Sequence, residues 1–230
     1  MGVIEIKKNM DIDRDGIEIK KGLLPEHLIH DVITEVEATS EVINKHGIRN
    51  AEKKFKTISK IARCQELIEE ARVILNDAPK VVRVIFFDKT PEKNWLVSWH
   101  QDKTVALSQK FELDGWGPWT IKENIHHVQP PLEVLNKMAT FRIHLDSANE
   151  ENGCLRIVLG SHKLGILKQD QISEIVNKEK VVPCVVNKGD TLIMRPHILH
   201  SSSKAIKPNH RRVIHIEFSS YKLPQNVRWA

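Results

Sequence analysis

The chain has 230 residues, of which 40% are hydrophobic and 28% are charged, and its formal net charge is +5. This composition is typical of a soluble globular protein and excludes a largely disordered chain. No apolar run approaches the ~18 residues of a membrane helix. The sequence contains no run of five basic residues of the kind that would indicate nucleic-acid binding. The three cysteines include no Cys-x-x-Cys pair, which argues against a disulfide framework or a thiolate zinc site.

The excess of positive charge has two interpretations. The plainer one is a mildly basic, soluble surface, and the functional one is attraction to an anionic substrate such as a carboxylate, a phosphate or a CoA ester. The N-terminus lacks a signal-peptide core and the C-terminus lacks a peroxisomal Ser-Lys-Leu. We therefore expect a cytoplasmic monomer that binds a small-molecule substrate, with no membrane or nucleic-acid partner.

The first third of the chain is predicted to be mainly helical, after a short strand at residues 17–19. A helix is predicted over residues 25–42, because Leu28, Val32 and Val36 recur at i+4. A second helix is predicted over residues 56–75, where apolar residues keep to one face. Both helices are expected to brace a sheet.

After Pro79 the pattern favours strands. Residues 81–87 are rich in β-branched and aromatic side chains, and a second strand is expected to carry His100 and Asp102 and to continue to residue 107. Residues 110–131 combine tryptophans and histidines with glycines and prolines, which predicts a long functional loop over the pocket. Further strands, separated by turn signals, are predicted at residues 140–145, 154–159, 181–186, 191–194 and 212–218.

This succession of short strands predicts a mainly β fold with flanking helices. Barrels and sandwiches have such spacing, and the jelly roll is one form of them. We expect a single domain over residues 1–230, with a helical part at about 22–78 and a β core at about 80–220.

His100 and Asp102 give the first chemical signal. Positions i and i+2 of a strand point to the same face, with Cα atoms ~6.5 Å apart. With a distant histidine they would form the 2-His-1-carboxylate triad of non-haem Fe(II) oxygenases, which leaves coordination positions open. His200 is favoured over His197 as the third ligand, because it opens a serine run and is better spaced from Arg211.

Arg211 is the candidate anchor for an anionic cosubstrate. A guanidinium binds a carboxylate through two parallel hydrogen bonds. Arg212 would point to the opposite face of the same strand. Arg211 shares its face with His215 and Glu217, whereas Arg212 shares its face with apolar residues, so Arg211 is expected in the pocket and Arg212 remains the alternative.

In their order along the chain, these motifs resemble the phytanoyl-CoA dioxygenase family of Fe(II)/2-oxoglutarate oxygenases. The resemblance spans roughly residues 85–220, and the helical N-terminal third is compatible with it. The matching stretches are Trp99-His100-Gln101-Asp102, Glu151-Asn152-Gly153-Cys154-Leu155, Gly160-Ser161-His162-Lys163, Gly189-Asp190, His200-Ser201-Ser202 and Arg211.

The resemblance implies a double-stranded β-helix core, the jelly-roll or cupin-like fold. It also implies Fe(II), with 2-oxoglutarate and O2 as cosubstrates and ascorbate as a candidate reductant. The implied iron ligands are His100, Asp102 and His200, and the implied cosubstrate contacts are Arg211, Ser202, Lys89 and Arg142.

The activity that follows is hydroxylation of a small molecule at a C–H bond, with release of succinate and CO2. Asp102 favours hydroxylation, because related halogenases place a small residue at that position. Two alternatives stay open: a cupin-like metal-dependent isomerase or hydrolase, and a non-catalytic binding protein on the same fold.

Overall fold

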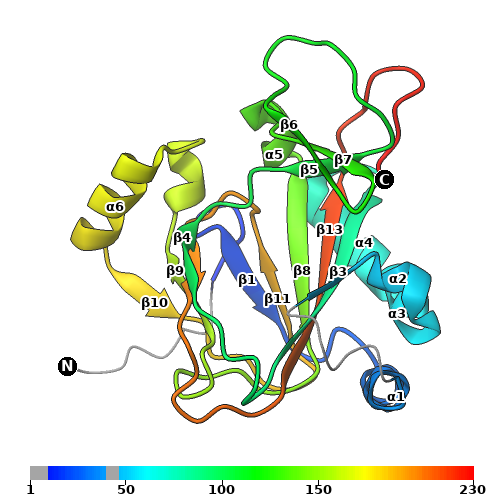
Figure 1. Cartoon of the computed structure of the whole chain (residues 1–230), viewed down its shortest axis with the longest axis vertical. Helices are drawn as coiled ribbons and strands as arrows, with labels where there is room; N and C mark the ends of the chain where they lie inside the picture. The colour runs from blue at the N-terminus through cyan, green and yellow to red at the C-terminus, as the bar shows by residue number, and fades with distance from the viewer. Residues whose placement is uncertain (1–9, 40–46) are drawn as a thin grey trace.

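The structure is a computed structural model that describes residues 10–39 and 47–230 (Figure 1). Its centre is a pair of antiparallel sheets that face each other. Helices lie on the outer face of the larger sheet, and a small third sheet lies at one end of the pair (Figure 1).

The larger sheet has the strand order β1-β11-β8-β13-β3-β2, and neighbouring strands are antiparallel. Because side chains alternate along a strand, one set faces the helices and the other faces the smaller sheet. The strands are β1 (Ile17–Lys20), β2 (Gly47–Arg49), β3 (Lys80–Lys89), β8 (Met138–His144), β11 (Thr191–Met194) and β13 (Arg211–Ser219).

The smaller sheet has the order β10-β9-β12-β4. An apolar cluster joins the two sheets on the β1–β11 side, where Leu192 and Met194 pack with Leu155 and Ile157. The strands are β4 (Val97–His100), β9 (Leu155–Val158), β10 (Val181–Pro183) and β12 (His200–Ser202). Two facing antiparallel sheets of this kind are the predicted jelly-roll arrangement.

The third sheet corrects the prediction of a loop over residues 110–131. Its order is β5-β7-β6, with β5 (Val105–Leu107), β6 (Trp119–Lys122) and β7 (Ile125–Val128). Glu123 and Asn124 join β6 to β7 with φ of 50° and 63°, which is the two-residue hairpin turn with both central residues left-handed. Glycine usually fills such a turn, and its absence here explains why the hairpin was missed.

Four helices of the N-terminal region pack on the larger sheet: α1 (Glu26–Glu37), α2 (Ala51–Lys54), α3 (Lys56–Ala62) and α4 (Gln65–Leu75). The helix predicted over residues 25–42 ends at Glu37, and positions 40–42 lie outside the described residues. The short strand predicted at residues 17–19 is present as β1, and β2, which the predicted helical part at 22–78 did not include, also joins the larger sheet.

The single helix predicted over residues 56–75 is wrong, because the chain breaks between α3 and α4. Cys64 is extended, with φ −69° and ψ 149°, and precedes α4. The buried residues of α4 are Leu67 and Ala71, so Ala71 faces the core as the predicted apolar face requires, whereas Leu67 takes the buried position expected for Ile68. Neither glycine nor proline marks the position, so periodicity alone gave no warning.

The remaining helices are α5 (Leu132–Asn136), the short 3-10 helix η2 (Ser161–Leu164) and α6 (Gln169–Lys178). The buried Ile172 of α6 packs with Val158 of β9 and with Leu199, which precedes β12, so this side of the smaller sheet is covered as well. Within residues 10–39 and 47–230, no helix has the length and apolar character of a membrane span.

Candidate metal centre

His100, Asp102 and His200 meet at one point between the sheets. His100 ends β4 and lies directly opposite His200, the first residue of β12. Asp102 Oδ1 lies 3.6 Å from His100 Nε2, and its Oδ2 lies 3.6 Å from His200 Nε2. The candidate ligand atoms of the three side chains all lie within 4.8 Å of one another.

Asp102 reaches this point although it is not on a strand. The prediction of a continuous strand from His100 to residue 107 is wrong, because β4 ends at His100. The Gln101 side chain explains the break: its amide donates to the carbonyls of Gly165 and His197, and its oxygen accepts from the Leu167 N–H. With Gln101 held on one side, its two neighbours turn toward the cavity.

Backbone hydrogen bonds orient both imidazoles. His100 Nδ1 lies 2.8 Å from the Ser98 carbonyl oxygen, and His200 Nδ1 lies 2.9 Å from that of Ile198. A carbonyl only accepts, so each Nδ1 carries the hydrogen and each Nε2 keeps its lone pair. Metal-bound histidines are commonly held in this way by a second partner.

The ionisation states suit a metal site. Burial tends to raise the pKa of Asp102, but its interactions with His100 and the neighbouring histidines lower it well below the ordinary value. Burial lowers the pKa of His200 to about 4. At neutral pH Asp102 is therefore a carboxylate and His200 is a neutral imidazole, the forms that bind metal.

These residues fit a divalent transition metal. Two ligand bonds of ~2.1 Å to one ion allow donor atoms up to ~4.2 Å apart, and Asp102 lies 3.6 Å from the Nε2 atom of each histidine. Two imidazoles and a carboxylate form the donor set typical of non-haem Fe(II) oxygenases. His100, Asp102 and His200 would hold the iron.

A second group of potential ligands, Asp102 with His215 and Glu217, also lies within 4.8 Å. Arg142 donates to His215 Nδ1 at 3.0 Å, so the hydrogen of His215 is on Nε2 and is donated to Glu217 at 3.1 Å. Arg83 pairs with the same Glu217 oxygen. These side chains thus form a polar network beside Asp102, in which Arg83 Nε and Arg142 Nε have no hydrogen-bond partner among the described residues.

The predicted cosubstrate contacts lie on neighbouring strands. Lys89 on β3 is directly opposite Arg211 on β13. Lys89 Nζ donates to Ser202 Oγ at 2.9 Å and to the Ser203 carbonyl at 2.6 Å. Within the described part of the chain, no carboxylate pairs with Arg211, although it is only 5% exposed.

Among the described residues, no carboxylate forms a salt bridge with Lys89, Arg142 or Arg211. Arg142 and Arg211 line the cavity, whereas Lys89 is buried beside Ser202 and does not line it. Burial lowers the pKa of Lys89 to about 7, and the charge of Arg211 adds to this effect. Burial likewise lowers the pKa of Arg211 to about 10, with the charge of Arg142 second. Buried cations normally pair with an anion, so this end of the cavity is suited to a carboxylate ligand.

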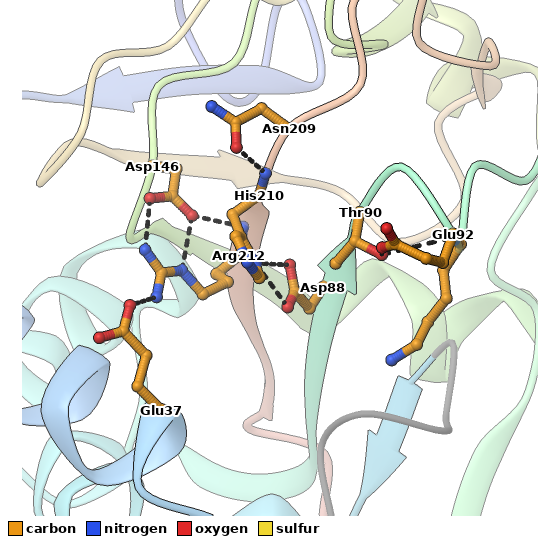
Figure 2. A network of polar contacts seen from close by, with 9 residues as sticks. Glu37, Asp88, Thr90, Glu92, Asp146, Asn209, His210 and Arg212 are labelled. Carbon is orange, nitrogen blue, oxygen red and sulfur yellow. Dashed lines mark hydrogen bonds and ion pairs between the residues drawn. The ribbon is translucent and has the colours of Figure 1, made fainter.

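Arg212 takes the opposite face (Figure 2). Its guanidinium binds both oxygens of Asp146 and a Glu37 oxygen at 2.6–2.8 Å, which ties α1 to the sheet. Beside it, His210 contacts the buried Asp88 carboxylate. Arg211 lines the cavity and Arg212 does not.

The cavity has a volume of about 280 Å³. The three candidate ligands, Arg142, Arg211 and Ser202 all line it. So do Arg49, Arg83, Lys122, His127 and His215, together with apolar side chains such as Phe87 and Trp95.

Other residues singled out from the sequence lie elsewhere. His197 is buried beside the His162 ring, with centroids 6.1 Å apart, and does not line the cavity. Trp116 and Trp119 pack edge-on against Phe111, so they stabilise the third sheet. His127, in contrast, faces the cavity.

Sequence reasoning missed the residues that meet through non-local pairing. Arg49, Arg83 and Lys122 come from three separate elements, and no motif links them. Gln101 lies between the two ligands of the His-x-Asp motif, and the motif itself predicts no structural role for it. Strand alternation in β13 was the one available signal for the network of His215 and Glu217.

Most of the sequence matches the model of one known protein family. The sequence model described as Phytanoyl-CoA dioxygenase (PhyH) matches residues 13–213, most of the chain. The match includes all three candidate ligands and Arg211.

Solved structures show the same fold. AviO1 from Streptomyces viridochromogenes Tue57 is 20% identical, with 93% of each chain covered and a TM-score of 0.67. HygX from Streptomyces hygroscopicus, solved with nickel and 2-oxoglutarate bound, is 14% identical over 90% of this chain and 83% of that one, with a TM-score of 0.64. SnoN, an epimerase in complex with Fe3+, alpha ketoglutarate and nogalamycin RO, is 14% identical over 95% and 82%, with a TM-score of 0.69.

Proposed function

The chain belongs to the phytanoyl-CoA dioxygenase family, and from this premise we propose that it hydroxylates a C–H bond of a small-molecule substrate. It is an Fe(II)/2-oxoglutarate-dependent oxygenase, as the jelly-roll fold and the family indicate. The observation that carries the proposal is the convergence of His100, Asp102 and His200 next to two buried arginines without carboxylate partners among the described residues.

Iron with 2-oxoglutarate and O2 supplies the oxidising power for the C–H bond, and succinate and CO2 are the by-products. The protein contributes three ligands and leaves the remaining positions around the metal for cosubstrate, O2 and an adjacent substrate. His100 and His200 keep their Nε2 lone pairs toward the metal because their Nδ1 hydrogens are bound by backbone carbonyls.

We assign the distal carboxylate of 2-oxoglutarate to Arg211, Lys89 and Ser202. Arg211 offers a planar fork, and Lys89 lies opposite it with a hydrogen bond to the Ser202 hydroxyl. A dicarboxylate whose other end reaches the metal would neutralise this buried charge. Arg142, on β8, lies between this end and the polar network and is a further candidate contact.

The metal centre is buried on its His200 side, where His200 and Ser202 are each 4% exposed. The His100 and Asp102 side chains are 38% and 24% exposed, so the centre is open on that side. A substrate bound there would exclude water and strengthen the electrostatic interactions of the charged groups.

Epimerisation is the second candidate, because SnoN has this fold and is described as an epimerase. The two reactions differ in the fate of the oxygen. With isotopically labelled O2, hydroxylation places one labelled atom in the product, whereas epimerisation leaves the product unlabelled.

The experiment is a metabolite panel incubated with Fe(II), 2-oxoglutarate and labelled O2, with succinate release and product mass as readouts. We expect one compound to stimulate succinate release and to gain one labelled oxygen. Stimulated succinate release with an unlabelled, inverted product would replace hydroxylation by epimerisation. A product formed without any 2-oxoglutarate consumption would instead support the isomerase or hydrolase alternative.

A further inference from the structure

We propose that Arg49, Arg83, Lys122 and His127 form an anion-binding subsite for the substrate at the far end of the cavity from the cosubstrate anchor. The ligand class is a small molecule with a carboxylate or phosphate group. The inference rests on the proposed function, because it specifies the substrate of the same site.

Charge is the first support. Five cationic side chains line the cavity, and Asp102 is its one carboxylate among the described lining residues. Fe(II) and the 2-oxoglutarate dianion balance each other, while Asp102 and the buried Glu217 beside Arg83 offset two of the five cationic side chains. Positive charge therefore remains in the cavity, and Arg49 and Lys122 carry part of it toward the substrate space.

Strand register places this charge away from the cosubstrate anchor. On β13, Arg211 is opposite Lys89, and Glu217 is opposite Arg83. Six residues of strand separate the two pairs, which corresponds to about 20 Å. A substrate held by its anion at the Arg83 end would extend toward the metal between them.

His127 is the second, independent support. It is 2% exposed and lines the cavity, yet its Nδ1 has no hydrogen-bond partner among the residues that the structure describes. Burial lowers its pKa to about 4, and the charges of Arg83, Lys122 and Arg49 contribute. A neutral imidazole with an unused polar atom, surrounded by three cations, suits a ligand oxygen.

The carboxylates nearby leave the cations available. Arg49 pairs with Glu123 at 3.2 Å, but both side chains are over 40% exposed, and such surface pairs contribute only about 0–1 kcal/mol. Within residues 10–39 and 47–230, Lys122 has no ion-pair partner. Glu217 is buried and holds Arg83 in place, while Arg83 Nε stays without a hydrogen bond.

Size restricts the ligand further. A cavity of about 280 Å³ lies below the usual ~300–1,000 Å³ of ligand sites and must also hold 2-oxoglutarate. The substrate is therefore small, or only its reacting part enters while the rest lies outside.

Matched aromatic probes test the subsite directly. Isothermal titration calorimetry would measure benzoate, phenyl phosphate and uncharged benzamide against anaerobic protein loaded with Fe(II) and saturating 2-oxoglutarate. We expect at least one anion to bind ten-fold or more tightly than benzamide, and the preferred anion identifies carboxylate or phosphate chemistry. Equal binding of benzamide, or no anion binding, would overturn the proposal.

Two variants of exposed residues at the subsite should change the affinity for the anion in opposite directions. The double variant Arg49→Met/Lys122→Met should weaken the anion at least ten-fold and leave benzamide unchanged, whereas Glu123→Gln should tighten the anion two- to five-fold by releasing Arg49. Lys110→Met/Lys163→Met is the control, because it removes the same two charges from exposed residues that do not line the cavity. Unchanged anion binding in the double variant would contradict the subsite.

The visible charge-transfer band of the Fe(II)–2-oxoglutarate chelate, recorded on the same samples, tests the proposed cosubstrate binding separately from the proposed anion subsite. A wild-type sample without the band refutes the cosubstrate assignment, whatever the probes do. A sample with the band but without anion preference refutes the subsite alone.

Discussion

At the scale of single residues, the metal centre depends on one cross-strand pair of histidines and on Asp102, which lies just outside strand β4. His100 and His200 face each other across β4 and β12, and Asp102 joins them because Gln101 is anchored on the other side. A substitution that releases Gln101 would therefore misplace a ligand that it does not touch.

The two adjacent arginines should behave differently. Arg211→Ala should raise the KM for 2-oxoglutarate by ten-fold to a hundred-fold, since a hydrogen bond to a charged group contributes about 1.5–3 kcal/mol. Arg212→Ala should leave that KM nearly unchanged and instead lower the free energy of unfolding by ~2 kcal/mol, because Asp146 loses its partner. Steady-state kinetics and urea denaturation check both, and reversed effects would refute the face assignment.

The pKa of Lys89 predicts how cosubstrate binding depends on pH. The free protein has a Lys89 pKa of about 7, lowered by burial, and a bound dicarboxylate would raise it. Above pH 7, binding then requires uptake of a proton, so the Kd for 2-oxoglutarate should increase with pH, by up to about ten-fold per pH unit.

Lys89→Met supplies the comparison for this prediction. Its Kd should be higher at pH 7 and should lose the steep increase between pH 7 and 9. Anaerobic calorimetry at several pH values would measure both proteins, and parallel pH profiles would exclude Lys89 as the titrating group.

Much of this residue scale could be predicted from the sequence. The His-x-Asp spacing, the serine run after His200 and the alternation of β13 each pointed to a residue that the cavity contains. The functional roles of these residues stay predictions. The Arg83–Glu217–His215–Arg142 network could not be foreseen, because its members meet only through the pairing of β3, β13 and β8.

At the scale of elements, the N-terminal helices are joined by side-chain caps. Glu35 of α1 accepts hydrogen bonds from the backbone N–H groups of Lys56 and Thr57, both at 2.8 Å, at the start of α3. A carboxylate at a helix N-terminus satisfies free N–H groups and interacts favourably with the helix dipole. This contact fixes the angle between the two helices over the sheet.

Glu35→Gln should lower the free energy of unfolding by ~1 kcal/mol at pH 7. Burial tends to raise the pKa of Glu35, but the hydrogen bonds from Thr57 and Lys56 lower it below 4.5. The stabilisation is therefore complete above pH 4.5 and is lost as the pH falls through the lowered pKa. Urea denaturation at pH 7 and in steps below pH 4.5 measures this difference.

Glu69→Gln is the matched control, since Glu69 is an exposed glutamate of α4. It should change stability by less than ~0.5 kcal/mol at either pH. A Glu35 variant that behaves like this control would contradict the capping role.

Elements were predicted best where periodicity is long. Strands β3, β8, β11 and β13 and helix α1 were found, because apolar alternation or i+4 repetition extends along them. The break at Cys64 and the β6–β7 hairpin were missed, because each depends on one or two backbone angles without a glycine or proline to mark them.

At the scale of the whole molecule, the helical layer and the larger sheet share one core. Buried side chains of α1, α3 and α4 pack with Val84, Phe86 and Ile214 on the outer face of the sheet. In the described part of the chain, the helices pack into the same cluster as the sheet. The single domain over residues 1–230 stays a prediction, and this shared cluster supports it.

A single domain predicts a single unfolding transition. Far-UV circular dichroism, which follows the helices, and fluorescence of the tryptophans near the third sheet and the cavity should coincide in urea. Two separated midpoints would show that the helical part at 22–78 and the β core at 80–220 unfold independently.

The jelly-roll architecture could be predicted from the sequence because the motifs resemble those of a family with that fold. Composition and strand spacing alone gave only a barrel or sandwich. The order of strands within each sheet could not be read from the sequence, since it is fixed by pairings between distant residues, such as His100 with His200, which are 100 positions apart.

The central claim is that one iron ion binds His100, Asp102 and His200. An anaerobic Fe(II) titration with 2-oxoglutarate, following the charge-transfer band, tests it most directly in wild type, His200→Ala and the matched variant His197→Ala. We predict one Fe(II) per chain in wild type and in His197→Ala, with loss of the band in His200→Ala. A band that persists in His200→Ala and disappears in His197→Ala would contradict the account.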